Sequence, residues 1–192
     1  MVELLKELVD SKDYVEIYTN SLDISKFAFG RIIAFDESFF IAALISPSGN
    51  YDGLLLKPND DIIKISNKTK YIEKMKVIIG DFIDQDYHFE SNDLITQLLL
   101  YAKKKNCIIS IELLHSGYDD ITGLVDSVKK HQFVIKQVDQ YGNDDGITYA
   151  NKNDITQISF DSSKENSLLK LYKYNISYSF SPYPYSKIIF LY

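Results

Sequence analysis

An internal repeat is the feature that most constrains this chain: residues 30–66 recur at residues 123–159 without a gap. The repeat is clearest in the glycines, which are paired 93 residues apart (123 − 30 = 93): Gly30 with Gly123, Gly49 with Gly142, and Gly53 with Gly146. Random placement at this composition would give roughly 0.2 glycine pairs at any one offset, so three pairs indicate duplication. The sequence therefore predicts one small module that is present twice.

Each module has the pattern of one helix followed by five short strands. Apolar residues at helical spacing predict helices over residues 2–10 and 94–102, the second after an N-cap segment at 91–93. β-Branched and aromatic runs bounded by turn residues predict strands at 15–19, 27–35, 39–45, 54–57 and 62–66, and at 109–113, 121–128, 132–138, 147–150 and 155–160. Further helices are expected at 70–79 and 164–173, the latter opened by a capping box at 162–165.

The paired glycines have two expected roles. Gly30 and Gly123 lie inside the second strand of each module, where a glycine marks a bend such as a barrel corner. The remaining positions belong to the hairpin loop between strands three and four, and we interpret them as structural turn residues rather than calcium ligands: Gly49, Asp52, Gly53, Gly142, Asp145 and Gly146. Closing five short strands into a bent barrel removes their exposed edges. The expected fold class is mainly β with short helices, as two tandem five-stranded small barrels.

The repeat also predicts the domain organisation. Residues 1–79 form a first barrel module, 80–92 an acidic connector, 93–173 a second barrel module and 174–192 an aromatic C-terminal tail. Alternation of Ile176, Tyr178 and Phe180 predicts an added strand in this tail. The tail is expected to cover a barrel or the seam between the two; stacking on bases and docking a protein are the alternatives.

Charge and cysteine content narrow the classes of function. The chain has 192 residues, a net charge of −6 and Arg31 as its only arginine, which disfavours duplex DNA and anionic membranes as partners. Cys107 is the only cysteine, so no internal disulfide can form and a reducing compartment fits. Residues 1–12 do not have the pattern of a signal peptide, and no apolar run approaches the ~20 residues of a membrane span. We therefore expect a cytoplasmic protein.

The order of elements resembles the Sm-like family of small RNA-associated barrels. The resemblance is closest in the family's first motif, which the first module matches at Gly30, Ile32, Phe35, Asp36, Phe39 and Ile41. In the second module Gly123, Val125, Val128 and Val134 match, and Lys129 stands where the motif has Asp. The family's second motif is absent from both modules. The resemblance implies the fold, and it implies single-stranded RNA as a possible ligand; SH3-like barrels give a similar pattern.

The resemblance to the Sm-like family also implies candidate ligand-binding residues. Ser38 and His131 occupy the position that often stacks on a base in the family, and Phe40 replaces the base-holding Asn of the first module. Lys129 and Lys130 precede His131 and would hold phosphate. The alternative interpretation is that residues 129–131 form a solvent-exposed loop without a ligand. His88, His115 and His131 do not have metal-ligand spacing, and neither a catalytic constellation nor a cofactor motif is expected.

These observations predict a non-catalytic binding or assembly module that acts through protein–protein contacts. The partner is an unknown protein or a second copy of the chain, because an acidic balance and missing RNA motifs favour proteins. The alternative is a single-stranded RNA-binding Sm-like protein, and a second alternative is an enzyme of unknown class.

Overall fold

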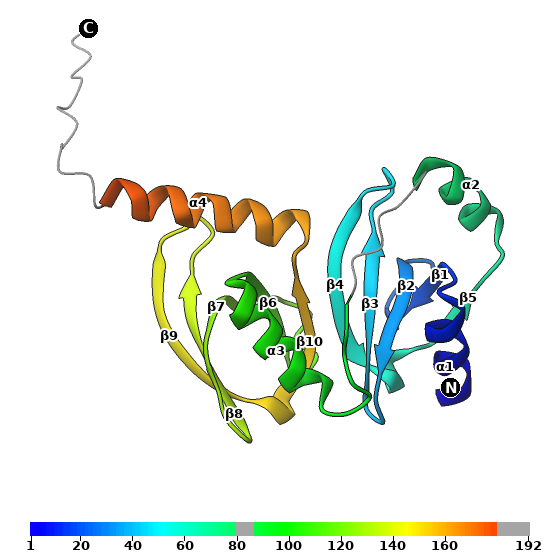
Figure 1. Cartoon of the computed structure of the whole chain (residues 1–192), viewed down its shortest axis with the longest axis horizontal. Helices are drawn as coiled ribbons and strands as arrows, with labels where there is room; N and C mark the ends of the chain where they lie inside the picture. The colour runs from blue at the N-terminus through cyan, green and yellow to red at the C-terminus, as the bar shows by residue number, and fades with distance from the viewer. Residues whose placement is uncertain (80–86, 180–192) are drawn as a thin grey trace, which may run out of the picture.

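The computed structural model describes residues 1–79 and 87–179 and contains one antiparallel sheet of ten strands (Figure 1). The strands of the first half are β1 (Val15–Tyr18), β2 (Ala28–Phe35), β3 (Phe39–Ile45), β4 (Tyr51–Pro58) and β5 (Lys64–Ser66). Those of the second half are β6 (Ile108–Leu113), β7 (Ile121–Val128), β8 (Gln132–Val138), β9 (Asp144–Asn151) and β10 (Ile155–Phe160). The prediction of a mainly β fold with short helices is confirmed.

The expected closure of each half into its own barrel is wrong. The strand order is β5-β1-β2-β3-β4-β10-β6-β7-β8-β9, so both halves contribute to one open sheet. The reason is that β4, at the edge of the first half, pairs with β10 of the second half. Closing a sheet into a barrel leaves no unpaired edge strand. Pairing β4 with β10 of the other half satisfies that edge without barrel closure.

Irregularities of register recur at matching positions in the two halves. The β2–β3 pairing shifts between Ile32 and Ala34, and the β7–β8 pairing shifts between Val125 and Ser127, 93 residues later (125 − 32 = 93). A β-bulge bends its strand and increases the local twist. The bends therefore fall at the same place in each half and give the two groups of strands their similar curvature (Figure 1).

The glycines of β2 and β7 permit a close approach of the neighbouring strand. A Cβ atom on Gly30 would meet the carbonyl oxygen of Ala43, and one on Gly123 would meet that of Lys136. Any side chain at these positions would push β3 or β8 away. The strands can therefore bend tightly only because both positions are glycine.

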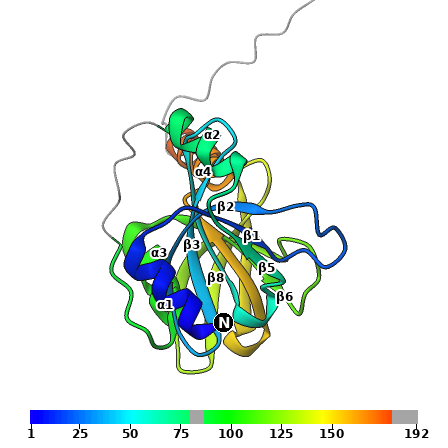
Figure 2. The same ribbon diagram turned by 90° about the vertical axis from the view of Figure 1, so that its right-hand side faces the viewer.

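In the described part of the chain, four helices accompany the sheet: α1 (Val2–Ser11), α2 (Lys70–Ile79), α3 (Leu94–Lys105) and α4 (Ser163–Ser179). Two short 3-10 turns are also present, η1 (Asn59–Asp61) and η2 (Lys152–Asp154). Figure 2 shows α1 and α3 on one side of the molecule and α2 and α4 at its upper end, where Figure 1 shows each of them over a different half. The first turn of α3 is capped twice: the Asp93 side chain accepts from Thr96 N at 3.3 Å, and Asp36 Oδ2 accepts from Leu94 N at 3.0 Å. The helices predicted at 2–10, 70–79 and 94–102 are confirmed.

The tail differs from the prediction. Ile176 and Tyr178 lie in α4 and not in an added strand, while Phe180 and the rest of the tail lie outside the described residues, as do residues 80–86 of the expected connector. Helix α4 is held at this end because Asn175 Nδ2 donates to the carbonyl oxygens of Tyr141 and Gly142, both at 2.9 Å. Contacts with the β8–β9 hairpin thus extend the helix beyond its expected end.

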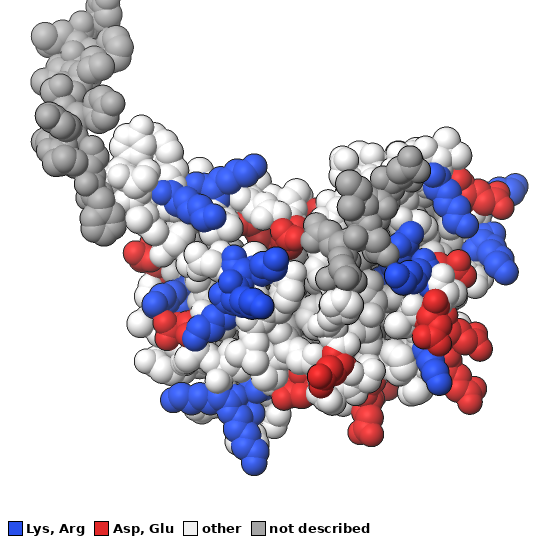
Figure 3. All heavy atoms as spheres, viewed as in Figure 1, with Lys and Arg blue, Asp and Glu red and all other residues white. Residues whose placement is uncertain are grey.

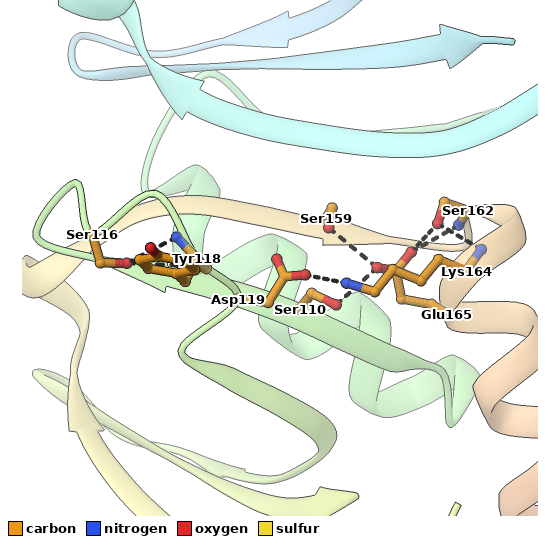
Figure 4. Close-up of polar contacts among 8 residues, drawn as sticks. All are labelled: Ser110, Ser116, Tyr118, Asp119, Ser159, Ser162, Lys164 and Glu165. Carbon is orange, nitrogen blue, oxygen red and sulfur yellow. Dashed lines mark hydrogen bonds and ion pairs between the residues drawn. The ribbon is translucent and has the colours of Figure 1, made fainter. Parts of the chain in front are cut away.

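A buried carboxylate fixes the start of α4 to the sheet. Glu165 accepts hydrogen bonds from Ser110 Oγ at 2.8 Å, Ser159 Oγ at 3.3 Å and Ser162 N at 3.1 Å (Figure 4). The Ser162 contact is the predicted capping box, and the other two reach β6 and β10. Because every partner is a hydroxyl or amide donor, the buried charge is well satisfied and orients the helix.

The largest hydrophobic core crosses from one half to the other. It combines Leu54 and Leu56 of β4 with Ile158 and Phe160 of β10 and with the inner face of α3. A smaller core under α1 belongs to the first half and contains Leu5, Leu8, Phe40 and neighbours. The first half therefore buries part of its apolar surface only against the second.

Two equivalent glycines provide a test of this junction. Gly53 and Gly146 have φ angles of 88° and 82°, but a Cβ on Gly53 would lie 2.5 Å from Phe160 O and 2.6 Å from Ser162 N, whereas a Cβ on Gly146 would meet nothing within 4 Å. Both alanine variants pay the same backbone strain, and only Gly53→Ala adds the clash. We expect Gly53→Ala to lower the free energy of unfolding by about 2 kcal/mol more than Gly146→Ala, measured by urea denaturation. Equal losses would contradict the described junction.

Candidate functional site

The junction between the halves, here called the seam, is the pairing of β4 with β10. Leu54 lies opposite Phe160, Leu55 opposite Ser159 and Leu56 opposite Ile158. Leu54 and Leu56 are 1% and 0% exposed. The seam is therefore an interface with main-chain pairing and a dry apolar core, which is how one sheet edge recognises another strand.

The equivalent edge of the second half has no such partner. β9 pairs with β8, and within residues 1–79 and 87–179 no strand pairs with its other side, here called the open edge. Ile147 and Tyr149, the counterparts of Leu54 and Leu56, are 56% and 73% exposed. Equivalent positions therefore hold apolar side chains that are buried in the seam on β4 and exposed to solvent at the open edge on β9.

More exposed apolar side chains lie near the start of β9. Tyr141 is exposed in the hairpin that precedes the strand, and Leu171 and Tyr174 are exposed on α4, which packs against that hairpin. The Tyr174 ring lies 4.4 Å from that of Tyr178, centroid to centroid. Exposed apolar groups gathered near an unpaired strand mark a candidate interaction surface.

Two of the predicted ligand-binding residues come together from different halves. Ser38, from the β2–β3 loop, and Lys130, from the β7–β8 loop, line one cavity of about 440 Å³, here called the loop cavity, together with residues 91–95 at the start of α3. Lys129 and His131 are exposed beside Lys130 but are not among the lining residues. Lys129, Lys130 and His131 were expected to act together, but only Lys130 reaches the loop cavity.

Phe40 requires a correction. Its side chain is fully buried in the core under α1, because its position in β3 faces inward, and it cannot hold a ligand at the surface. The same applies to Phe133, its counterpart in β8. Both phenylalanines therefore belong to the cores.

Lys152 also lines the loop cavity, although the sequence did not predict it as a binding residue. It is 7% exposed, its Nζ donates to Thr96 Oγ1, and no carboxylate of the described residues lies within ion-pair distance. A buried ammonium normally needs a counter-charge. The repeat does not predict a cation at this position, because the counterpart of Lys152 in the first half is the uncharged Asn59. The Asn59 side chain has a structural contact instead: its Nδ2 donates to Asp36 O at 2.9 Å.

The acidic residue at the loop cavity serves the structure. Asp36 accepts from Ser38 N and Phe39 N, both at 2.8 Å, and its second oxygen caps α3. One carboxylate thus sets the conformation of the loop that carries Ser38 and ties it to the helix of the other half. On the face drawn in Figure 3, Lys side chains lie mainly over the half with α3 and α4, and acidic ones gather at the lower part of the other half.

Of the predicted turn residues, Gly49 and Gly142 lie in the turns that join β3 to β4 and β8 to β9. The other four lie within strands, because pairing begins earlier than predicted: Asp52 and Gly53 are at the start of β4, and Asp145 and Gly146 are at the start of β9. The four glycines have positive φ: Gly49 at 84°, Gly53 at 88°, Gly142 at 76° and Gly146 at 82°. Asp52 Oδ1 accepts from Ser163 N at 3.1 Å at the start of α4, and Asp145 is exposed. Asp52 is therefore engaged in holding a helix.

Two titratable groups near the seam have raised pKa values. Burial raises the pKa of the Cys107 thiol, which keeps it protonated at neutral pH. Burial also raises the pKa of Tyr87 to about 12, where its hydroxyl lies 2.6 Å from that of Tyr51. Among the residues that the structure describes, no three His, Cys, Asp or Glu side chains are grouped to hold a metal ion, and no helix is long and apolar enough to cross a membrane.

Comparisons with known proteins give no relative: no protein-family model, curated protein or solved structure matches this chain.

The different positions of Phe40 and Ser38 lead to opposite expectations for their variants. Phe40→Ala opens a cavity in a closed core and should lower the free energy of unfolding by about 3–5 kcal/mol. Ser38→Ala, at an exposed loop position, should change it by less than about 0.5 kcal/mol. Urea denaturation of both variants tests this assignment; a Phe40→Ala protein as stable as the parent would contradict the burial of Phe40.

Proposed function

We propose that the chain is a non-catalytic assembly module, built from duplicated Sm-like units, that joins protein partners by adding a strand at the open edge. The observation that carries the proposal is the contrast between β4, which is paired in the seam, and β9, which has the same place in its half and no partner. A strand with one free side offers a row of main-chain donors and acceptors to another chain.

The side chains of β9 favour pairing. Ile147 and Tyr149 are exposed, and burying each would contribute about 1.5–3 kcal/mol. Natural edge strands are usually protected by Lys, Pro or an inward charge. β9 contains neither Lys nor Pro, and its two charged residues, Asp144 and Asp145, lie at its start. Gly146 leaves open space where Gly53 closes on the β10 backbone.

A second copy of this chain provides the best-matched strand. In the seam Leu56 lies opposite Ile158; 93 residues earlier than Ile158 stands Ile65 in β5, at the far edge of the sheet (158 − 93 = 65). Tyr149 of one copy would thus lie opposite Ile65 of the next, and the chains would add head to tail.

The mass of the intact chain in solution, measured over a wide concentration range by light scattering, tests this proposal. We expect the mass to rise in steps of 22.1 kDa. Lysine at both apolar positions, Ile147→Lys with Tyr149→Lys, should abolish the rise, because it places two charges on the surface to be buried. Two lysines at exposed positions of α2, Val77→Lys with Ile78→Lys, are the matched control and should leave association unchanged. A monomer at every concentration would sink the proposal.

A second candidate function, binding single-stranded RNA, is favoured by the loop cavity. Lys130 and the uncompensated Lys152 supply positive charge there, and Ser38 supplies a hydroxyl. Stacking and phosphate contacts of this kind do not require a strongly basic protein. The cavity's acidic members, Asp36, Glu37 and Asp93, oppose it, so we place this function second.

Anisotropy of labelled U-rich and A-rich RNA at low salt tests the second candidate. Binding should weaken with salt, with a slope of about −0.7 in log K against log[salt] for each phosphate contact. Lys130→Ala should weaken binding about tenfold and lower that slope, while Lys68→Ala, an exposed lysine outside the cavity, should not. Equal effects of the two variants, or no binding at low salt, would remove RNA as a ligand.

A further inference from the structure

A second cavity crosses the seam and is separate from the open edge and the loop cavity. It has a volume of about 640 Å³, within the usual range of roughly 300–1,000 Å³ for small-molecule sites. The first half contributes residues 19–22, Lys57, Asp60, Asp61 and Ile63; the second half contributes Glu112, His115, Gly117, Tyr118, Asp119 and Gln157. We call it the seam cavity.

The charges of the seam cavity do not balance. Asp61 lies 3.8 Å from Lys57 Nζ and 3.9 Å from His115 Nδ1, and Asp119 is turned toward Lys164, with which it forms an ion pair (Figure 4). Asp60 and Glu112 have no such partner among the described residues. The cavity therefore keeps two negative charges that the protein itself does not neutralise.

Of these two carboxylates, Glu112 is the buried one, with 8% of its surface exposed. Its Oε1 accepts from Gly117 N at 2.7 Å, and this is the one hydrogen bond that its carboxylate makes with the described residues. A carboxylate removed from water normally has its charge paired and its lone pairs filled. Glu165 meets that condition with three serines, and Glu112, which lines the cavity, does not.

Three of the residues that line the seam cavity have large apolar side chains. Leu22, Ile63 and Tyr118 line it and are exposed. An aromatic face attracts a cation, and aliphatic side chains pack against methylene groups. Carboxylates and apolar side chains that line the same cavity are complementary to an ammonium group on an aliphatic chain.

A metal ion fits less well. Mg²⁺ and Ca²⁺ require several oxygen ligands at short range. Among residues 1–79 and 87–179, no three acidic or other ligand side chains are grouped in that way. The uncompensated carboxylates are those of Glu112 and Asp60, which come from different halves and suit a ligand with two separated charges.

We infer that the seam cavity binds an aliphatic polyamine. One ammonium donates to Glu112 Oε2, a second lies near Asp60, and the methylene chain between them packs along Leu22, Ile63 and Tyr118. This site bridges the two halves, so an occupied cavity would stabilise the pairing of β4 with β10. The inference does not depend on the proposed assembly function, because none of its residues lies at the open edge.

Titration calorimetry of the intact chain with spermidine, in buffer of physiological ionic strength, tests the inference. Glu112→Gln keeps the Oε1 acceptor for Gly117 N, so the loop should stay folded while the charge is lost. Loss of a charged hydrogen bond should weaken spermidine binding about tenfold or more. Glu73→Gln, at an exposed position of α2, changes the net charge equally and should leave the affinity within about twofold of the parent.

Two further measurements separate a site from general attraction to an acidic protein. Tyr118→Ala should weaken binding about threefold, through the lost cation–π contact. Mg²⁺ at matched ionic strength should not displace spermidine. Equal weakening by Glu112→Gln and Glu73→Gln, or full displacement by Mg²⁺, would overturn the inference, and a normal melting curve for Glu112→Gln would show that misfolding is not the cause.

Discussion

The pairing of β4 with β10 is the interaction on which the rest of the structure depends. It supplies a partner to one edge strand of each half and brings Leu54, Leu56 and Phe160 into a common core. Without it those side chains would face water, a loss of about 1.5–3 kcal/mol for each. Both cavities described above also combine residues of the two halves, so the pairing creates the sites as well as the core.

A duplicated open unit has a geometric consequence. Each five-stranded half begins with one edge and ends with another, and joining two halves uses only one edge of each. β5 and β9 must remain at the ends of the sheet. They are not alike: β5 has three residues, whereas β9 has eight and exposes Ile147 and Tyr149. The longer, more apolar end is the one where association is physically favoured.

Most helices and strands could be predicted from the sequence, but the way in which the strands pair into one sheet could not. Strands at 39–45, 121–128 and 132–138 follow directly from glycine, turn and apolar patterns, which act over a few residues. The β4–β10 pairing joins residues about a hundred positions apart and leaves no local pattern, so barrel closure was the wrong expectation. Tyr178 alternates as in a strand, yet Asn175 anchors that segment as a helix. Of the candidate site, Ser38 and Lys130 were predicted; Lys152 was not, because burial depends on tertiary packing.

Buried charges separate structural roles from functional ones in this chain. Glu165 is surrounded by serine donors and holds α4 in place, and Asp36 uses both oxygens to order a loop and cap α3. Lys152 and Glu112 are equally buried, but each has one protein partner and lines a cavity. The desolvation of a charge is offset only when its shell is complete. A complete shell explains the residue within the fold, whereas an incomplete shell at a cavity wall leaves the charged atom open to a ligand of opposite charge.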